Sequence, residues 1–324
     1  MSTNKNIKLR QLGQTGIHIS PIGLGCWQFS EGKGGATGTW DPIPVEETNG
    51  IVRAALDGGI NWFDTAELYG YGRSERAIAQ ALKLAGKANQ DVIIATKWNP
   101  IGRTARSITQ TIGERQKHLN GFTIDLYQIH APVAFASRES EMNAMADLVE
   151  AGKIRSIGIS NYNARQMRRA HDVLLTRGLR LTSNQVRYSL LNRRIESNGI
   201  LDTAKELGVT IIAYSPLDMG LLTGKFHKNP ALLDNRPFLR RQQLRRKLES
   251  SRELINALED IAQAHGVTTS QVALNWLINF HGDTVVAIPG ASKIRHAEQN
   301  VGAMTFTLSD TELTRIDGLS KQFM

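Results

Sequence analysis

The stretch EETNGIVRAALDGGINWFD, residues 46–64, contains the pattern on which the fold prediction rests. Apolar residues recur at helical spacing over Glu46–Asp57, and the pair Gly58-Gly59 then indicates a turn. Ile60–Phe63 is a short apolar run typical of a buried strand, and a second such run at 21–27 precedes the helix. The order strand, helix, strand predicts a unit of two parallel strands joined by a helix.

The same alternation recurs along the rest of the chain. Further strands are predicted at Val92–Thr96, Asp125–Ile129, Ser156–Ile159, Thr182–Val186, Thr210–Tyr214 and Thr284–Ile288. Helices are predicted at Ser74–Leu84, Thr104–Leu119, Glu139–Ala151, Ala164–Thr176, Gly199–Leu207, within Ser250–Phe280 and at Arg295–Gly302. About eight such units in 324 residues predict an α/β fold with one domain over residues 1–324, a closed (β/α)8 TIM barrel.

Three segments fall outside this repeat. Residues 7–19 hold two short runs around a glycine-containing turn, which predicts an N-terminal β-hairpin at the bottom of the barrel. The glycine-rich stretch Glu31–Thr39 is predicted to be a mobile loop on the functional face. The longest excursion, Leu217–Lys247, follows the seventh strand and is predicted to form an extended lid loop.

Composition excludes several other classes of protein. Hydrophobic residues make up 41% of the chain and charged residues 21%, which suits a large core and excludes general disorder. No apolar stretch approaches the ~18–20 residues of a membrane span. The only cysteine, Cys26, can form neither an intrachain disulfide nor a zinc cluster with other cysteines, so no metal site is predicted. The polar amino terminus shows no secretion signal, and we expect a cytoplasmic protein.

Polar residues follow the predicted strands at the point where each strand ends. Asp64, Lys97 and His130 come at the ends of three consecutive strands. Each has an ordinary structural interpretation, as a turn cap, a solvated charge or a buried histidine. Because active sites of TIM barrels lie at the carboxyl ends of the strands, their equivalent positions favour a shared functional site. Other polar residues at strand ends are Ser160, Asn161, Gln185 and Ser215.

Several motifs in the chain occur in a familiar order. They are NWFDTAELYG (61–70), DVIIATK (91–97), DLYQIH (125–130), GKIRSIGISN (152–161), YSPL (214–217), GLLTGK (220–225) and IPGAS (288–292). Together they resemble the signatures of the aldo-keto reductases over nearly the whole chain. The agreement of several independent motifs is far more specific than one glycine pattern.

The resemblance implies that Asp64, Tyr69, Lys97 and His130 form a catalytic tetrad. Tyr69 would be the proton donor, and Lys97 would favour its phenolate and bring its pKa, ordinarily about 10, closer to neutrality. Asp64 would hold Lys97 by an ion pair, and His130 would orient or polarise the substrate carbonyl. Tyr71 is the rival proton donor, but its spacing from Asp64 matches the family less well.

The resemblance also implies NADPH as the cofactor and a small carbonyl compound as the substrate. No strand-linked Gly-x-Gly-x-x-Gly is present, so barrel loops are expected to hold the pyrophosphate. The implied cofactor-binding residues are Ser160, Asn161 and Gln185 with Tyr214 near the nicotinamide, Leu217, Gly220, Leu222 and Lys225 near the pyrophosphate, and Gly290, Ser292, Lys293, His296, Gln299 and Asn300 near the adenosine. Trp27 and Ser215 are also expected to bind the cofactor.

Two positions in the adenosine segment depart from the family pattern. Many members have arginine where His296 stands and glutamate where Gln299 stands. Lys293 is the predicted contact of the 2′-phosphate, with Arg295 as the nearby alternative. The substrate cleft is predicted to be lined by Trp27, Trp98, Asn99 and Val133.

Other interpretations remain open at the level of sequence. The chain carries 39 Lys and Arg against 30 Asp and Glu, and the basic string at 236–247 could bind nucleic acid. A lid segment or a contact in a homo-oligomer is favoured for this string, because no recognition motif accompanies it. The family also resembles the β subunits of potassium channels, so an NADPH-sensing regulatory subunit is the alternative to a reductase. Cys26 is interpreted as a small buried hydrophobe rather than a redox switch.

Overall fold

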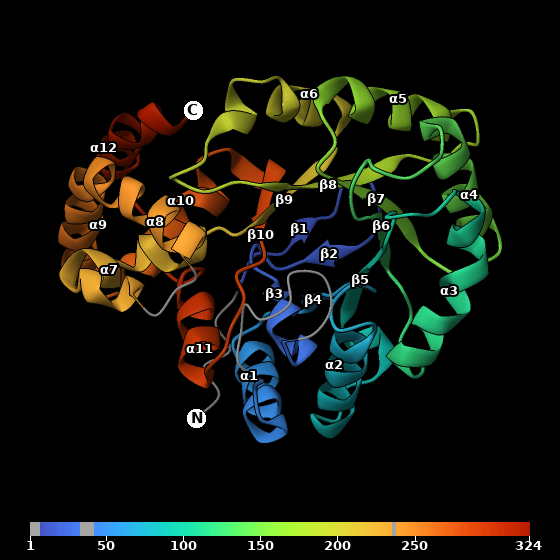
Figure 1. The fold of residues 1–324 in the computed structure, drawn as a ribbon, viewed down its shortest axis with the longest axis horizontal. Coiled ribbons are helices and arrows are strands. Elements are labelled where there is room, and N and C mark those ends of the chain that lie inside the picture. Colours follow the sequence, from blue (N-terminus) through green and yellow to red (C-terminus); the bar gives the residue numbers. More distant parts are fainter. Residues whose placement is uncertain (1–6, 33–41, 235–237) are drawn as a thin grey trace.

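Eight parallel strands form the centre of the molecule (Figure 1). The computed structural model describes residues 7–32, 42–234 and 238–324. Each strand pairs with the next one along the chain. The strands are β3 (Leu24–Gly25), β4 (Trp62–Asp64), β5 (Ile93–Trp98), β6 (Leu126–Ile129), β7 (Ser156–Ser160), β8 (Leu181–Arg187), β9 (Thr210–Tyr214) and β10 (Val285–Ala287). Parallel order without reversal is the topology of a (β/α)8 barrel.

The first and last strands meet and close the sheet. The amide of Gly23 donates to the carbonyl of Ala287 at 2.9 Å, and that of Gly25 donates to the carbonyl of Pro289 at 3.1 Å. Parallel bridges join Ile22 to Ala287 and Gly25 to Gly290. The predicted (β/α)8 barrel is therefore confirmed.

Helices alternate with the strands and surround them (Figure 1). They are α1 (Val45–Asp57), α2 (Arg73–Leu84), α3 (Arg106–Leu119), α4 (Arg138–Glu150), α5 (Ala164–Leu175), α6 (Ile200–Leu207), α9 (Arg252–His265), α10 (Thr269–Asn279), α11 (Ile294–Gly302) and α12 (Asp310–Ser320). All the predicted helices are present. Sequence analysis missed α12, although a capping box between Ser309 and Glu312 marks its beginning.

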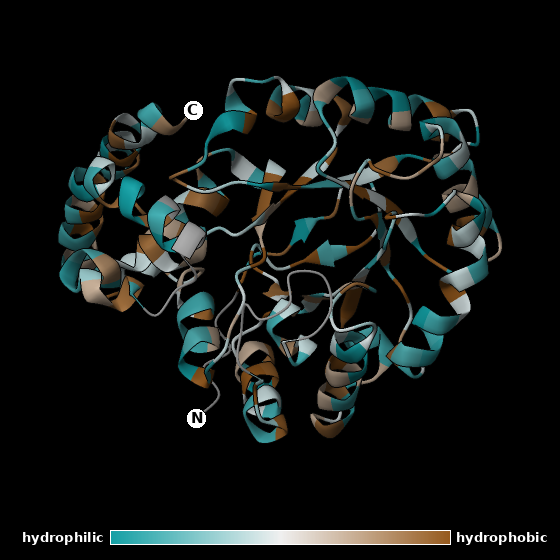
Figure 2. Cartoon of the chain, in the orientation of Figure 1, coloured by the Kyte–Doolittle hydropathy of each residue, from teal (hydrophilic) through white to brown (hydrophobic). Residues whose placement is uncertain are grey.

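Apolar side chains form a layer inside the barrel and a larger layer between the strands and the helices. Figure 2 shows hydrophobic residues along the strands and hydrophilic residues on the outer helix surfaces. Trp62 is fully buried inside the barrel, where its indole N–H donates to the carbonyl of Ser20 at 2.9 Å. Gly23 leaves the space that the Trp62 ring occupies, since a Cβ at position 23 would lie 2.3 Å from Trp62 Cε2.

The N-terminal hairpin closes the lower end of the barrel. Its strands β1 (Arg10–Gln11) and β2 (His18–Ile19) pair antiparallel, as predicted. The amide of Gly13 in the turn donates to Thr210 Oγ1 at 2.7 Å, at the beginning of β9. Leu12 and Ile17 join the apolar layer inside the barrel. The loops that follow the strands lie at the opposite end of the barrel, where the carboxyl termini of the strands meet.

The long segment after β9 is helical rather than an irregular lid loop. It contains the 3-10 helices η4 (Asp218–Thr223) and η5 (Pro230–Leu233) and the α-helices α7 (Lys225–Lys228) and α8 (Phe238–Ser250). The carboxylate of Asp218 is fully buried and binds Arg187 at 2.5 Å and Lys247 at 2.6 Å. Arg245 pairs with Asp234 at 2.8 Å, so part of the basic string at 236–247 is neutralised within the chain.

Two further sequence predictions concern loops and membranes. The predicted mobile loop at Glu31–Thr39 falls largely on residues 33–41, outside the described residues. None of the helices in the described part of the chain has the length and apolar character needed to cross a membrane.

We expect Gly23→Ala to destabilise the barrel by about 1–3 kcal/mol, because the added methyl collides with a buried ring that has no room to move. The matched control is Gly113→Ala in the exposed face of α3, where nothing lies within 4 Å of the added Cβ. That change should stabilise the protein by roughly 0.5–1 kcal/mol through helix propensity. Urea denaturation of the three proteins measures both effects, and equal midpoints would contradict the packing argument.

Candidate active site

An ion pair between Asp64 and Lys97 lies at the carboxyl ends of β4 and β5. Lys97 Nζ is 2.5 Å from Asp64 Oδ1 and donates to the carbonyl of Thr65 at 2.9 Å. The other oxygen of Asp64 accepts from Gln185 Nε2 at 2.9 Å and from Gln128 Nε2 at 3.2 Å. Burial lowers the pKa of Lys97, but Asp64 and the neighbouring Tyr69 raise it more, so the pKa lies above its usual value. Lys97 is therefore a permanent cation at neutral pH.

Tyr69 packs against this ion pair from the loop between β4 and α2. Lys97 Nζ lies 4.9 Å from the centroid of the Tyr69 ring. Burial raises the pKa of the Tyr69 hydroxyl and Lys97 lowers it, and the effect of burial is larger. Lys97 therefore shifts this pKa in the predicted direction, toward neutrality, and limits the rise that burial causes. Tyr71, the rival proton donor, is 66% exposed.

His130 completes the predicted tetrad immediately after β6. Its ring meets the ring of Tyr69 edge-on, with centroids 5.6 Å apart and an interplanar angle of 78°. Burial, and then the charge of Lys97, lower the pKa of His130 to about 3. The imidazole is neutral at physiological pH, so it can donate a hydrogen bond from one ring nitrogen without carrying charge. The structure thus brings all four tetrad residues together.

The turn after β7 is linked to the tetrad and to β9. Asn161 has a left-handed backbone with φ 62°, and its Nδ2 donates to the carbonyl of His130 at 3.3 Å. The Tyr214 hydroxyl donates to Asn161 Oδ1 at 3.0 Å. Ser160 Oγ donates to the carbonyl of Gln185 at 2.8 Å. These contacts place the amide and hydroxyl groups of three strand ends beside the tetrad.

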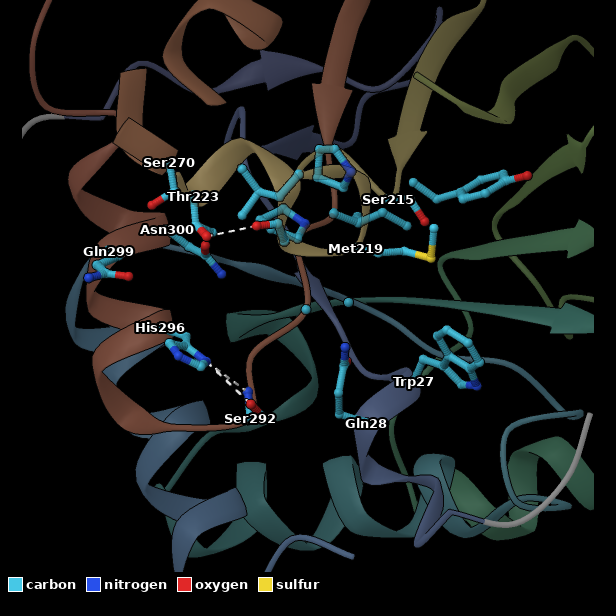
Figure 3. Close-up of a pocket in the computed structure, with 18 of the residues that line it drawn as sticks. Trp27, Gln28, Ser215, Met219, Thr223, Ser270, Ser292, His296, Gln299 and Asn300 are labelled. Carbon is cyan, nitrogen blue, oxygen red and sulfur yellow. Dashed lines mark hydrogen bonds between the residues drawn. The ribbon is translucent and has the colours of Figure 1, made fainter. Parts of the chain in front are cut away.

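A cavity of about 1390 Å³ connects the tetrad with α11. Asp64, Tyr69 and His130 lie on its wall, whereas Lys97 is buried behind it. The predicted cofactor residues on the wall are Trp27, Ser160, Asn161, Gln185, Tyr214, Ser215, Leu217, Gly220, Lys225, Gly290, Ser292, His296, Gln299 and Asn300. Figure 3 shows Trp27 and Gln28 in one part of this cavity and Gln299, Asn300 and Ser270 in another. The cavity is large enough for an elongated ligand, since sites for drug-sized molecules measure about 300–1,000 Å³.

Several sequence predictions do not place residues on this wall. Leu222 is fully buried in the core, and Lys293 is exposed at the N-cap of α11. Trp98 is also fully buried, with its indole N–H 3.1 Å from Ser107 Oγ of α3, so its assignment to the substrate cleft was wrong. The physical reason is strand alternation: Lys97 points toward the barrel mouth, and its neighbour must point toward the helices. Asn99 and Val133, also predicted for the substrate cleft, are not among the residues that line this cavity.

Sequence analysis also missed residues that line the cavity. They include Gln28, Leu68, Arg187, Met219, Thr223, Glu259, Gln263, Thr268 and Ser270. Arg187 follows Gln185 by two residues in β8, so strand alternation could have found it. The residues of α9 and α10 carry no local signal, because only the folding of the long segment after β9 brings them to the cavity. Cys26 also lines the cavity and is buried, in agreement with its interpretation as a small hydrophobe.

The end of the cavity at α11 is cationic and polar. Lys225 and Arg295 lie on its wall. The buried Asn300 also lies there, and its Nδ2 has no hydrogen-bond partner within residues 7–32, 42–234 and 238–324. Gln28 Oε1 likewise has no hydrogen-bond partner within these described ranges. Buried polar atoms without partners are costly, so this wall is suited to a ligand with polar groups and negative charge.

Comparison with known proteins gives a consistent result. The sequence model described as "Aldo/keto reductase family" matches residues 21–321. The chain is 33% identical to the chloroplastic pyridoxal reductase of Arabidopsis thaliana, over 94% of this chain and 84% of that protein. It is 30% identical to the aldo-keto reductase yakc [NADP(+)] of Schizosaccharomyces pombe, over 96% and 91%. Among solved structures, the thermostable aldo-keto reductase Tm1743 in complex with the inhibitor epalrestat matches with a TM-score of 0.78 and 31% identity, over 97% of this chain and all of that one.

We expect Asp64→Asn to destabilise the fold by about 3–5 kcal/mol, because it leaves the Lys97 ammonium buried without its counter-charge. Lys97→Met in the same chain removes that charge, so the double variant should recover most of the loss. Urea denaturation midpoints of the wild type, both single variants and the double variant complete the cycle. A double variant as unstable as the sum of the single changes would contradict the ion-pair interpretation.

Proposed function

The chain belongs to the aldo/keto reductase family, and on this premise we propose that it is an NADPH-dependent reductase that converts aldehydes and ketones to alcohols. The observation that carries the proposal is the arrangement of the site. Tyr69, His130 and the buried Asp64–Lys97 pair meet at one end of a single cavity, and cationic and amide side chains line the other end.

The cavity fits a dinucleotide cofactor. Asn300 Nδ2 and Gln28 Oε1, which have no partners in the described parts of the chain, offer a donor and an acceptor to a polar ligand. Ser160, Asn161 and Gln185 would hold the nicotinamide amide, and Tyr214 would support its ring. Leu217, Gly220 and Lys225 would face the pyrophosphate, and Ser292, His296, Gln299 and Asn300 would hold the adenosine 2′-phosphate and adenine. When bound, the cofactor supplies a hydride to the substrate's carbonyl carbon.

Tyr69 would transfer its hydroxyl proton to the carbonyl oxygen as that oxygen gains negative charge. The resulting phenolate would lie beside the Lys97 ammonium, whose positive charge stabilises it. Neutral His130 would donate a hydrogen bond to the same oxygen and so fix the carbonyl. The product is an alcohol, and Tyr69 recovers its proton from solvent.

A panel of aldehydes and ketones, followed by loss of NADPH absorbance, tests the proposal. Turnover of any member of the panel supports the reductase assignment. If NADPH binds tightly and no carbonyl is reduced, the regulatory subunit predicted as the alternative is favoured instead.

We expect Tyr69→Phe to lower turnover by at least ~100-fold, the lower range for loss of a general acid, with little change in NADPH affinity. The matched control is Tyr71→Phe, which removes a hydroxyl two residues away from an exposed ring. This control should retain nearly full turnover. The reverse pattern, an inactive Tyr71→Phe and an active Tyr69→Phe, would show that the proton donor is misassigned.

Arg295 and Lys293 are the candidates for the cation that contacts the 2′-phosphate. Because Arg295 lies on the cavity wall and Lys293 does not, we expect the larger effect from Arg295→Ala. A charged hydrogen bond contributes about 1.5–3 kcal/mol, less when exposed, so NADPH affinity should fall about tenfold and NADH affinity should stay unchanged. Titration of tryptophan fluorescence with both cofactors measures this. A larger loss in Lys293→Ala would reassign the contact.

A further inference from the structure

His296 occupies the cationic end of the cavity, at the third position of α11. Figure 3 shows its ring directed toward Ser292, on the segment that enters the helix. His296 Nδ1 lies 3.3 Å from Ser292 Oγ and 3.4 Å from the backbone nitrogen of Ser292. Both of these contacts use Nδ1, and the half-buried ring borders the cavity. Nε2 is therefore the atom that can meet a ligand.

Ser292 can accommodate both protonation states of this ring. When the imidazole is neutral, Nδ1 accepts from the backbone N–H or the hydroxyl of Ser292, and the proton resides on Nε2. When the imidazole is protonated, Nδ1–H can donate to Ser292 Oγ instead. In each state Nε2–H remains available as a donor. Protonation thus adds a positive charge at the cavity. It ends the hydrogen bond from the Ser292 backbone N–H to Nδ1 and keeps the contact with Ser292 Oγ.

The charges around His296 come from three elements. Arg295 and Lys293 belong to α11 and its N-cap, Lys225 begins α7, and Glu47 lies on α1. Glu47 Oε1 accepts from the backbone N–H of Ile294 at 2.9 Å, which fixes α1 against the beginning of α11. Burial, and then Arg295, Lys225 and Lys293, lower the pKa of His296, whereas Glu47 raises it. The ring is consequently uncharged at neutral pH unless a further anion approaches.

We propose that His296 is a specificity-determining residue that takes up a proton when the 2′-phosphate of NADPH binds, so that the preference for NADPH over NADH weakens as pH rises. This inference rests on the proposed function, because it assumes that the cavity holds a dinucleotide with its adenosine at α11. The proton comes from solvent and is released again when the cofactor leaves. NADH lacks the 2′-phosphate, so its binding does not favour protonation of the His296 ring.

The direction of the pH dependence follows from linkage. A phosphate close to the ring favours the imidazolium, so the pKa of His296 is higher in the NADPH complex than in the protein alone. Below the lower value the ring is charged in both states, and affinity for NADPH is highest. Between the two values binding takes up a proton and affinity falls with rising pH. Above the higher value the ring is neutral in both states, and affinity is lowest.

The experiment measures the affinities of NADPH and NADH by tryptophan fluorescence between about pH 5.5 and 8.5, a range around the ordinary histidine pKa. We expect the ratio of NADPH to NADH affinity in the wild type to fall about tenfold, which corresponds to a separation of one pKa unit. His296→Gln keeps a neutral amide donor but cannot titrate, so this fall should be absent. His296→Arg is charged throughout, and its ratio should be high without the fall.

Two controls isolate the contribution of the histidine. The phosphate itself titrates near pH ~6, but it gains negative charge as pH rises and acts equally on all variants. Calorimetry in buffers of different ionisation enthalpy counts the protons taken up on binding. We expect uptake in the wild type with NADPH at neutral pH, and neither with NADH nor in His296→Gln. Urea denaturation midpoints equal to that of the wild type show that the variants remain folded.

The outcomes separate this inference from the proposed function. If NADPH binds in preference to NADH but the ratio changes equally with pH in the wild type and in His296→Gln, the role of His296 is overturned and the reductase proposal stands. Absence of proton uptake when the wild type binds NADPH also overturns the role of His296. If neither cofactor binds at any pH, both proposals fail.

Discussion

A lysine ammonium without access to water requires a counter-charge, and the need to supply it to Lys97 shapes the mouth of this barrel. Asp64 and the carbonyl of Thr65 satisfy the ammonium, and Gln185 and Gln128 satisfy the second oxygen of Asp64. The network therefore joins strands β4, β5, β6 and β8. Buried ion pairs add little net stability when compared with apolar residues of the same size. In the observed arrangement of the strand ends, each of these buried groups has a partner.

A second group of buried charges supports the loop that carries Tyr69. Glu67 Oε2 accepts from the backbone N–H of Asn99, directly after β5, and its Oε1 binds Arg103 at 2.7 Å and Arg115 at 3.0 Å. The backbone N–H of Glu67 donates to the carbonyl of Lys97 at 3.1 Å. The loop is thus fastened to the strand that bears Lys97. The contacts of Glu67 therefore fix the position of the Tyr69 loop relative to Lys97.

What could be predicted from the sequence follows from the range of the forces involved. Helices and strands were predictable because periodicity and turn residues act within about a dozen residues. The meeting of Asp64, Lys97 and His130 was predictable because each lies at the end of its own strand, whereas Tyr69 was assigned from the family motif. The helical nature of the segment after β9 was missed, since only long-range contacts such as that between Asp218 and Lys247 fix it. Trp98 was wrongly assigned to the substrate cleft, because successive residues of a strand point to opposite faces and Trp98 points away from the barrel mouth. Ser270 reaches the cavity from α10 with no sequence signal at all.

Several residues at or beside the wall of the cavity have a strained backbone. Asn161, Ser215, Asp218 and Met219 have positive φ angles of 62°, 51°, 44° and 58°, and all four lie at or beside the cavity. Left-handed geometry costs about 1 kcal/mol or more for residues other than glycine, so it persists only where surrounding contacts enforce it. Asp218 provides such contacts through its two ion pairs, one to β8 and one to α8. Ser215 and Met219 themselves lie on the wall of the cavity. Three of these residues, Ser215, Asp218 and Met219, belong to the segment that joins β9 to the cationic end of the cavity, where the ion pairs of Asp218 hold the backbone in place.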